Sequence, residues 1–84
     1  MKYELLYTKR AARDISRLDQ VAKERLRKTL ERYAQSPFDY AKKMVDPALG
    51  TYRFRIGEYR VIFDVESNKI VVLRVGHRRE IYRG

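Results

Sequence analysis

Residues 52–65, YRFRIGEYRVIFDV, carry the clearest secondary-structure pattern in the chain. Aromatic or aliphatic residues alternate with polar ones on both sides of a Gly-Glu pair at 57–58, and a period of two is typical of β-strands. A glycine at the first position suits a two-residue hairpin turn. The pattern therefore predicts strands over 51–56 and 59–65, joined as an antiparallel hairpin.

The arginines of this hairpin fall on one face. Successive side chains of a strand point to opposite faces, and a two-residue turn sets Arg55 opposite Arg60. Arg53 lies on the same face, away from the aromatic and aliphatic side chains. Like charges directly opposite each other destabilise an antiparallel pair. A phosphate between two guanidinium groups reverses that cost, so the spacing indicates an exposed anion-binding face.

The segments outside the hairpin also carry strand and helix signals. Partial alternation predicts a first strand over residues 2–7. Two helices follow, with Thr8 and Asp19 as N-caps, and Pro37 stops the second helix because the residue before a proline avoids the helical region. A last strand is expected over residues 70–75.

These elements predict an α+β fold with a single domain over residues 1–84. The order is an N-terminal strand, an antiparallel helix hairpin and an antiparallel β-meander of three or four strands, since residues 41–45 suit either a short strand or an extended arm. The helices must cover one face of the sheet for either layer to bury its apolar side. No segment remains for the other face, so the arginine face is expected to be open to solvent.

Composition narrows the function. Twenty Lys and Arg against eleven Asp and Glu give a formal net charge of +9, which favours nucleic acid, an anionic membrane surface or an acidic protein as partner. The chain has no cysteine and no apolar run approaching the ~20 residues of a membrane span, so a cytoplasmic protein without a membrane contact is expected. No acidic or histidine cluster has metal-ligand spacing, so neither a metal nor a small-molecule cofactor is expected.

Residues 52–65, followed by VGHRREIY at 75–82, resemble the RelE/ParE toxin superfamily, and its RelE branch most closely. The resemblance extends over the whole chain. It implies a compact α+β toxin of a type II toxin–antitoxin system that is neutralised by a cognate antitoxin, expected here to be small, acidic and wrapped around the toxin. It also implies a ribosome-dependent mRNA interferase, an endoribonuclease that cleaves mRNA in the ribosomal A site and inhibits translation.

The resemblance further implies a site on the meander and the C-terminal segment. The residues expected to take part in catalysis are Arg55, Arg60, Arg78, Tyr82 and His77. The residues expected to bind RNA beside them are Arg53, Arg79, Lys42 and Lys43. In this reading the arginines stabilise the extra negative charge of the transition state, and Tyr82 stacks on a base or positions the RNA backbone.

One position departs from the best-known RelE, which carries lysine where Arg55 stands. That lysine is a proposed general base, and arginine cannot replace it because its pKa stays above ~12. Proton transfer must then come from another group. His77 is the first candidate because a histidine works from either protonation state near neutral pH, and Glu58 and Glu80 are weaker candidates.

Two other functions stay open at this point, because a fold does not fix a function. A ParE-like toxin shares the fold but poisons DNA gyrase. A non-catalytic module that binds RNA or the ribosome is the other alternative, and Arg55 in place of lysine gives it some support.

Overall fold

A computed structural model describes residues 2–46 and 48–81 of the chain. It contains two α-helices, one short 3-10 helix and five strands within those residues. In chain order they are β1 (Glu4–Tyr7), α1 (Lys9–Ser16), α2 (Gln20–Tyr33), η1 (Pro37–Asp39), β2 (Lys42–Lys43), β3 (Tyr52–Ile56), β4 (Tyr59–Glu66) and β5 (Lys69–His77).

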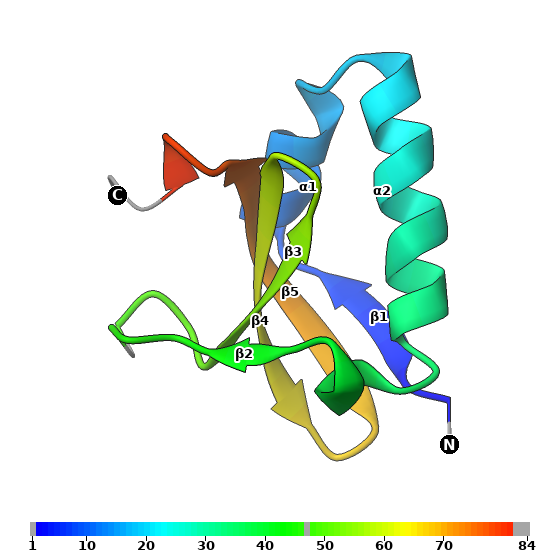
Figure 1. Cartoon of the computed structure of the whole chain (residues 1–84), viewed down its shortest axis with the longest axis vertical. Coiled ribbons are helices and arrows are strands. Elements are labelled where there is room, and N and C mark those ends of the chain that lie inside the picture. The colour runs from blue at the N-terminus through cyan, green and yellow to red at the C-terminus, as the bar shows by residue number, and fades with distance from the viewer. Residues whose placement is uncertain (1, 47, 82–84) are drawn as a thin grey trace.

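The strands form one sheet in the order β1-β5-β4-β3-β2. Strands β2 to β5 are antiparallel neighbours, whereas β1 pairs with β5 in parallel. A parallel pair needs a crossover connection, and here the helix hairpin is part of it (Figure 1). The expected α+β fold with an N-terminal strand, a helix pair and a meander is confirmed, and the short strand β2 makes the meander four-stranded.

Both helices begin where their caps predict. The Thr8 hydroxyl accepts a hydrogen bond of 3.1 Å from the Ala11 amide. The Asp19 carboxylate accepts one of 2.7 Å from the Ala22 amide. Such caps satisfy amide groups that the first helical turn leaves without a partner. The second helix ends at Tyr33, before the proline that was expected to stop it.

The main core lies between the helices and one face of the sheet (Figure 1). Leu26 and Leu30 of α2 pack there against Phe54 of β3 and Phe63 of β4, and all four are almost fully buried. The two phenylalanine rings are stacked with centroids 4.2 Å apart. The alternation predicted for β3 is therefore confirmed, because its apolar side chains point into this core.

The other face of the sheet is partly covered, which corrects the expectation of an open face. Ile62, on β4, is completely buried there. The connection between β2 and β3 lies over it, because a Cβ atom at Gly50 would collide with the Ile62 side chain. The Thr51 amide also donates a 2.8 Å hydrogen bond to the Asp64 carboxylate. In Figure 1 this connection and the C-terminal turn lie on the side of the sheet away from the helices.

The last strand is longer than the predicted 70–75 and runs through Gly76 to His77. Beyond the end of β1, its free edge meets α1 instead of another strand. Asp14 of α1 accepts 3.0 Å hydrogen bonds from the Val75 amide and from the Arg74 side chain. A helix side chain thus completes the edge of β5, a partner that strand alternation cannot predict.

No helix in the part of the chain that the structure describes is long and apolar enough to cross a membrane.

Candidate nucleic-acid interface

The pairing of β3 with β4 places three arginines on one face, as the hairpin pattern predicts. Ile56 lies opposite Tyr59 and Arg55 lies opposite Arg60. Gly57 has φ +60°, the left-handed conformation that a glycine adopts at the first position of this turn. Because Arg53 is two residues from Arg55 along β3, it shares that face, which is turned away from the helices.

The three arginines differ in how far their side chains are buried. Arg55 is exposed and Arg53 is half-buried, but Arg60 is only 6% exposed. Its guanidinium Nη1 donates hydrogen bonds of 3.1 Å to the Gly57 carbonyl and 3.0 Å to the Tyr59 carbonyl. The expectation that Arg60 lies open to solvent is therefore wrong. Its guanidinium group instead stabilises the hairpin turn through these hydrogen bonds.

The C-terminal turn helps to explain this burial. Gly76 of β5 is the cross-strand neighbour of Arg60. A Cβ atom at Gly76 would lie 3.5 Å from Ile81, which is itself buried. The last described residues thus fold back over the row that contains Arg60. Strand alternation predicts the face to which a side chain points but not what returns to cover it.

A basic hollow lies where β2 meets β3. Lys42 is the register partner of Arg53, so the two side chains share a face. Together with Arg55 and the ring of Tyr40 they line a shallow cavity of about 80 Å³. In the described part of the chain, no acidic side chain forms an ion pair with any of these three cations. Their charges are therefore available to an anionic ligand. We call this feature the basic hollow.

Lys43 does not join the hollow. It lies opposite Tyr52, and the Tyr52 ring stacks on Phe63 of the helix-side core with centroids 5.7 Å apart. Adjacent residues of a strand point to opposite faces. The two lysines, expected to act together, are thus on opposite sides of the sheet.

The C-terminal basic residues are also divided between the faces. His77 lies opposite Tyr59, and their rings are 6.1 Å apart and nearly perpendicular. Tyr59 lines a hollow with Ala22 and Leu26 of α2, so His77 lies on the helix side, away from Arg55. Its Nδ1 accepts a 3.2 Å hydrogen bond from the amide of Arg79, an exposed residue.

Arg78 follows on the arginine side. Its amide donates a 2.8 Å hydrogen bond to the Glu58 carbonyl, which continues the strand ladder past β5. Its guanidinium Nε lies 2.9 Å from the Glu58 carboxylate, and His77 Nε2 lies 4.0 Å from the same carboxylate oxygen. The Glu58 side chain thus pairs with Arg78 and connects the hairpin turn to the segment after β5. Tyr82, the expected base-stacking residue, lies outside the described residues.

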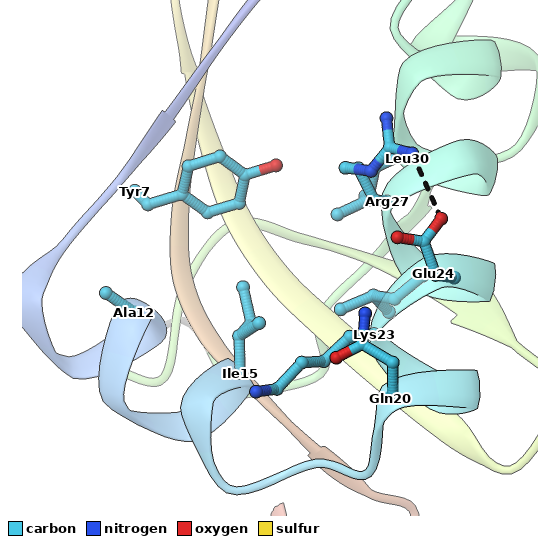
Figure 2. Close-up of a pocket in the computed structure, with 9 residues that line it drawn as sticks. Tyr7, Ala12, Ile15, Gln20, Lys23, Glu24, Arg27 and Leu30 are labelled. Carbon is cyan, nitrogen blue, oxygen red and sulfur yellow. Dashed lines mark hydrogen bonds and ion pairs between the residues drawn. The ribbon is translucent and has the colours of Figure 1, made fainter.

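A second, more apolar groove lies among β1, α1 and α2, with a volume of about 470 Å³. Its floor includes Ile15 and Leu30, and Glu24 and Arg27 form an ion pair of 3.1 Å at its rim. Figure 2 shows the Tyr7 ring reaching from β1 across this groove towards α2. Burial, and then the negative charge of Glu31, raises the pKa of the Tyr7 hydroxyl above its ordinary value. The lining of this groove is mostly apolar, whereas the basic hollow is lined mainly by cationic side chains.

Tyr40 was not singled out from the sequence, although it precedes Lys42 by only two residues. The start of β2 brings Tyr40 close to Arg55, because both side chains line the basic hollow. The closeness of Tyr40 to Lys42 in the sequence indicates a shared site only when residues 42–43 are known to form a strand paired with β3. Among residues 2–46 and 48–81, no three His, Cys, Asp or Glu side chains are grouped to hold a metal ion.

Known proteins are similar to this chain in both fold and sequence. Residues 5–82 match the ParE toxin family of type II toxin–antitoxin systems. The chain is 31% identical over 90 residues to the toxin RelG of Mycobacterium tuberculosis, with 99% of each protein covered. The fold and the sequence therefore define a small toxin of the RelE/ParE type.

Solved structures agree with that class. The RelBE2 toxin–antitoxin complex of M. tuberculosis contains a chain that superposes with a TM-score of 0.83 at 25% identity, covering 93% of this chain and 100% of that one. A mutant of the Escherichia coli toxin RelE in the free state gives a TM-score of 0.77 at 26% identity, covering 98% and 92%. The chain belongs to the ParE toxin family within the RelE/ParE superfamily, and it is the toxin of a RelBE-like type II system.

Proposed function

We propose that this toxin is a ribosome-dependent endoribonuclease that cuts mRNA in the ribosomal A site. The observation that carries the proposal is the cluster of Lys42, Arg53 and Arg55 on one face with no acidic partner among the described residues. A surface of this kind binds the RNA backbone. Arg78 stands at the rim of the same face, held by Glu58.

The reaction is a metal-independent transesterification. The 2′-oxygen of one nucleotide attacks the adjacent phosphorus, and the bond from phosphorus to the 5′-oxygen breaks. The products are a 2′,3′-cyclic phosphate and a 5′-hydroxyl. The 2′-hydroxyl proton passes to a carboxylate of the site, and solvent water supplies the proton that the leaving 5′-oxygen takes up, so the step is balanced without a cofactor.

Arg55 and Arg78 stabilise the negative charge that develops on the phosphate, as preorganised cations do. Lys42 and Arg53 bind the phosphates on either side. Arg60 contributes indirectly, because its hydrogen bonds to Gly57 and Tyr59 hold the turn that carries Glu58. Glu58 is the carboxylate at this rim and is the group proposed to accept the 2′-hydroxyl proton.

The site has few acid–base groups, so most of the rate must come from orienting the RNA. The ribosome supplies that orientation, and free RNA is expected to be a poor substrate. The antitoxin is proposed to be an acidic RelB-like protein. It would neutralise the basic hollow, or occupy the groove among β1, α1 and α2 shown in Figure 2.

The test is cleavage of a reporter mRNA by purified toxin, with and without programmed ribosomes, mapped by primer extension. Wild-type toxin should cut only the ribosome-bound mRNA, and Arg55→Ala should lose the activity. Arg13→Ala is the matched control, because Arg13 is an exposed arginine on α1 away from the basic hollow. Equal cleavage with and without ribosomes contradicts the dependence, and full activity of Arg55→Ala contradicts the site.

The match to the ParE family supports a second candidate, a toxin that poisons DNA gyrase. The same strain that expresses the toxin distinguishes the two functions. Broken DNA with intact mRNA after induction supports gyrase poisoning. Cut mRNA with intact DNA supports the endoribonuclease.

A further inference from the structure

The basic hollow contains an aromatic ring as well as three cations. Tyr40 lines it together with Lys42, Arg53 and Arg55. Tyr40 remains 44% exposed although it sits on a folded segment of the chain. Cations that bind phosphate and a ring that binds a base are the two parts from which sites for single-stranded nucleic acid are built.

The Tyr40 ring is held in place from behind. It stacks on Tyr33 of α2 with centroids 4.0 Å apart and an interplanar angle of 8°. Tyr33 in turn meets the buried ring of Phe54 edge-on, at 5.1 Å and 62°. The ring is therefore fixed to the core through two aromatic contacts. A ligand that stacks on a ring fixed in this way loses little free energy to ordering it.

The charges around the ring favour a polyanion. No acidic side chain of the described chain forms an ion pair with Lys42, Arg53 or Arg55, whereas Arg27, Arg74 and Arg78 all have carboxylate partners. Lys42 and Arg53 are register partners across β2 and β3, so their cationic groups project from adjacent positions. This spacing suits consecutive phosphates of one strand.

We propose that the basic hollow is a nucleotide subsite in which an unpaired base stacks on Tyr40 while its phosphates bind Lys42, Arg53 and Arg55. The inference rests on the proposed function, because it takes RNA as the ligand. It adds Tyr40 to the RNA-binding residues and requires the bound RNA to be single-stranded. A base within a duplex has no free face on which the tyrosine ring could stack. Every unpaired base has a face that can stack on a ring, so the subsite binds RNA with little sequence preference.

The experiment measures binding of a short 2′-O-methyl RNA that carries 2-aminopurine, a fluorescent base that is quenched when it stacks. Wild type and Tyr40→Phe should quench the probe. Tyr40→Leu should lose the quenching and bind about 5- to 100-fold more weakly, the usual effect of removing one stacking ring. Tyr7→Leu is the matched control, because Tyr7 is a similarly exposed tyrosine outside the hollow.

A second measurement needs no variant and therefore does not depend on how Tyr40→Leu folds. A 4-thiouridine in the same oligonucleotide should crosslink to the wild-type peptide that contains Tyr40. Crosslinks found only elsewhere, or equal binding by Tyr40→Leu and wild type, overturn the subsite. Annealing the oligonucleotide to its complement should abolish the crosslink to the peptide that contains Tyr40, and a crosslink that persists with the duplex also overturns the subsite.

The outcomes separate the subsite from the proposed function. Ribosome-dependent cleavage by wild type, combined with unchanged binding by Tyr40→Leu, removes the subsite and leaves the function. Absence of both RNA binding and cleavage in wild type removes the function itself. A hollow that binds an acidic peptide but not the RNA probe overturns the subsite in favour of a protein ligand.

Discussion

The carboxylate of Glu58 lies 2.9 Å from the guanidinium Nε of Arg78, and the backbone groups of the two residues share a 2.8 Å hydrogen bond. The turn between β3 and β4 therefore supplies a counter-charge for an arginine at the rim of the basic face. Both side chains are largely exposed, at 62% and 48%. Ion pairs of this kind are weak in water, so an incoming phosphate is able to displace the carboxylate.

Replacing Glu58 by glutamine should separate RNA binding from cleavage. The variant removes the carboxylate that competes with RNA for Arg78. Its affinity for a non-cleavable RNA should therefore rise by about two- to fivefold at low salt, which corresponds to the free energy of an exposed ion pair. Its cleavage rate on the ribosome should fall, because the proposed proton acceptor is lost. Fluorescence anisotropy measures the first effect and primer extension the second.

Glu66→Gln is the control for that experiment, because Glu66 is an exposed residue at the far end of β4 and the change in net charge is the same. General electrostatic attraction would affect both variants alike. If Glu58→Gln and Glu66→Gln bind and cleave RNA equally, Glu58 has no special relation to Arg78 in function.

Arg55 and Arg60 lie opposite each other but should respond differently to alanine. Arg60→Ala should lower the free energy of unfolding by about 1–3 kcal/mol, because a buried guanidinium loses its hydrogen bonds to two carbonyl groups of the hairpin turn. Arg55→Ala should leave stability unchanged or slightly higher, since it removes a like charge across the strand pair. Urea denaturation measures both, and a stable Arg60→Ala would show that its burial is of no structural consequence.

Asp14 should be important for stability although it is remote from the basic hollow. Its carboxylate, only 9% exposed, accepts hydrogen bonds from the Val75 amide and the Arg74 side chain. Asp14→Ala leaves both donors unpaired at the edge of β5, at a cost of about 1–3 kcal/mol. Asp19→Ala, which removes only a helix cap, should cost about 1 kcal/mol. Equal melting temperatures for wild type and Asp14→Ala would contradict this account of the β5 edge.

The Tyr7 hydroxyl should make stability fall at alkaline pH. Burial and then Glu31 raise its pKa, so above the ordinary value of about 10 the unfolded chain loses this proton first. The unfolded state then binds fewer protons, and the free energy of unfolding decreases until the pH passes the folded pKa. Tyr7→Phe lacks this proton, so its stability relative to wild type should be greater at pH 11 than at pH 9. Parallel changes in both proteins would exclude Tyr7 as the cause.

The local elements, and the side of the sheet on which most key residues lie, can be predicted from the amino-acid sequence. Period-two alternation and a glycine-first turn gave the register of Arg55 with Arg60. Polar caps at Thr8 and Asp19 gave the starts of both helices. These features are readable because each depends on residues close together in the chain, whose geometry the backbone itself restricts.

Which of those residues are exposed to solvent, and which contact one another, depends on how the elements pack in the folded chain. The burial of Arg60 follows from a C-terminal turn that packs over Gly76. The basic hollow exists because a two-residue strand pairs with β3 and brings Tyr40 to Arg55. Both depend on contacts between segments far apart in the chain. Such contacts are set by the burial of apolar surface across the whole fold, which no local pattern encodes.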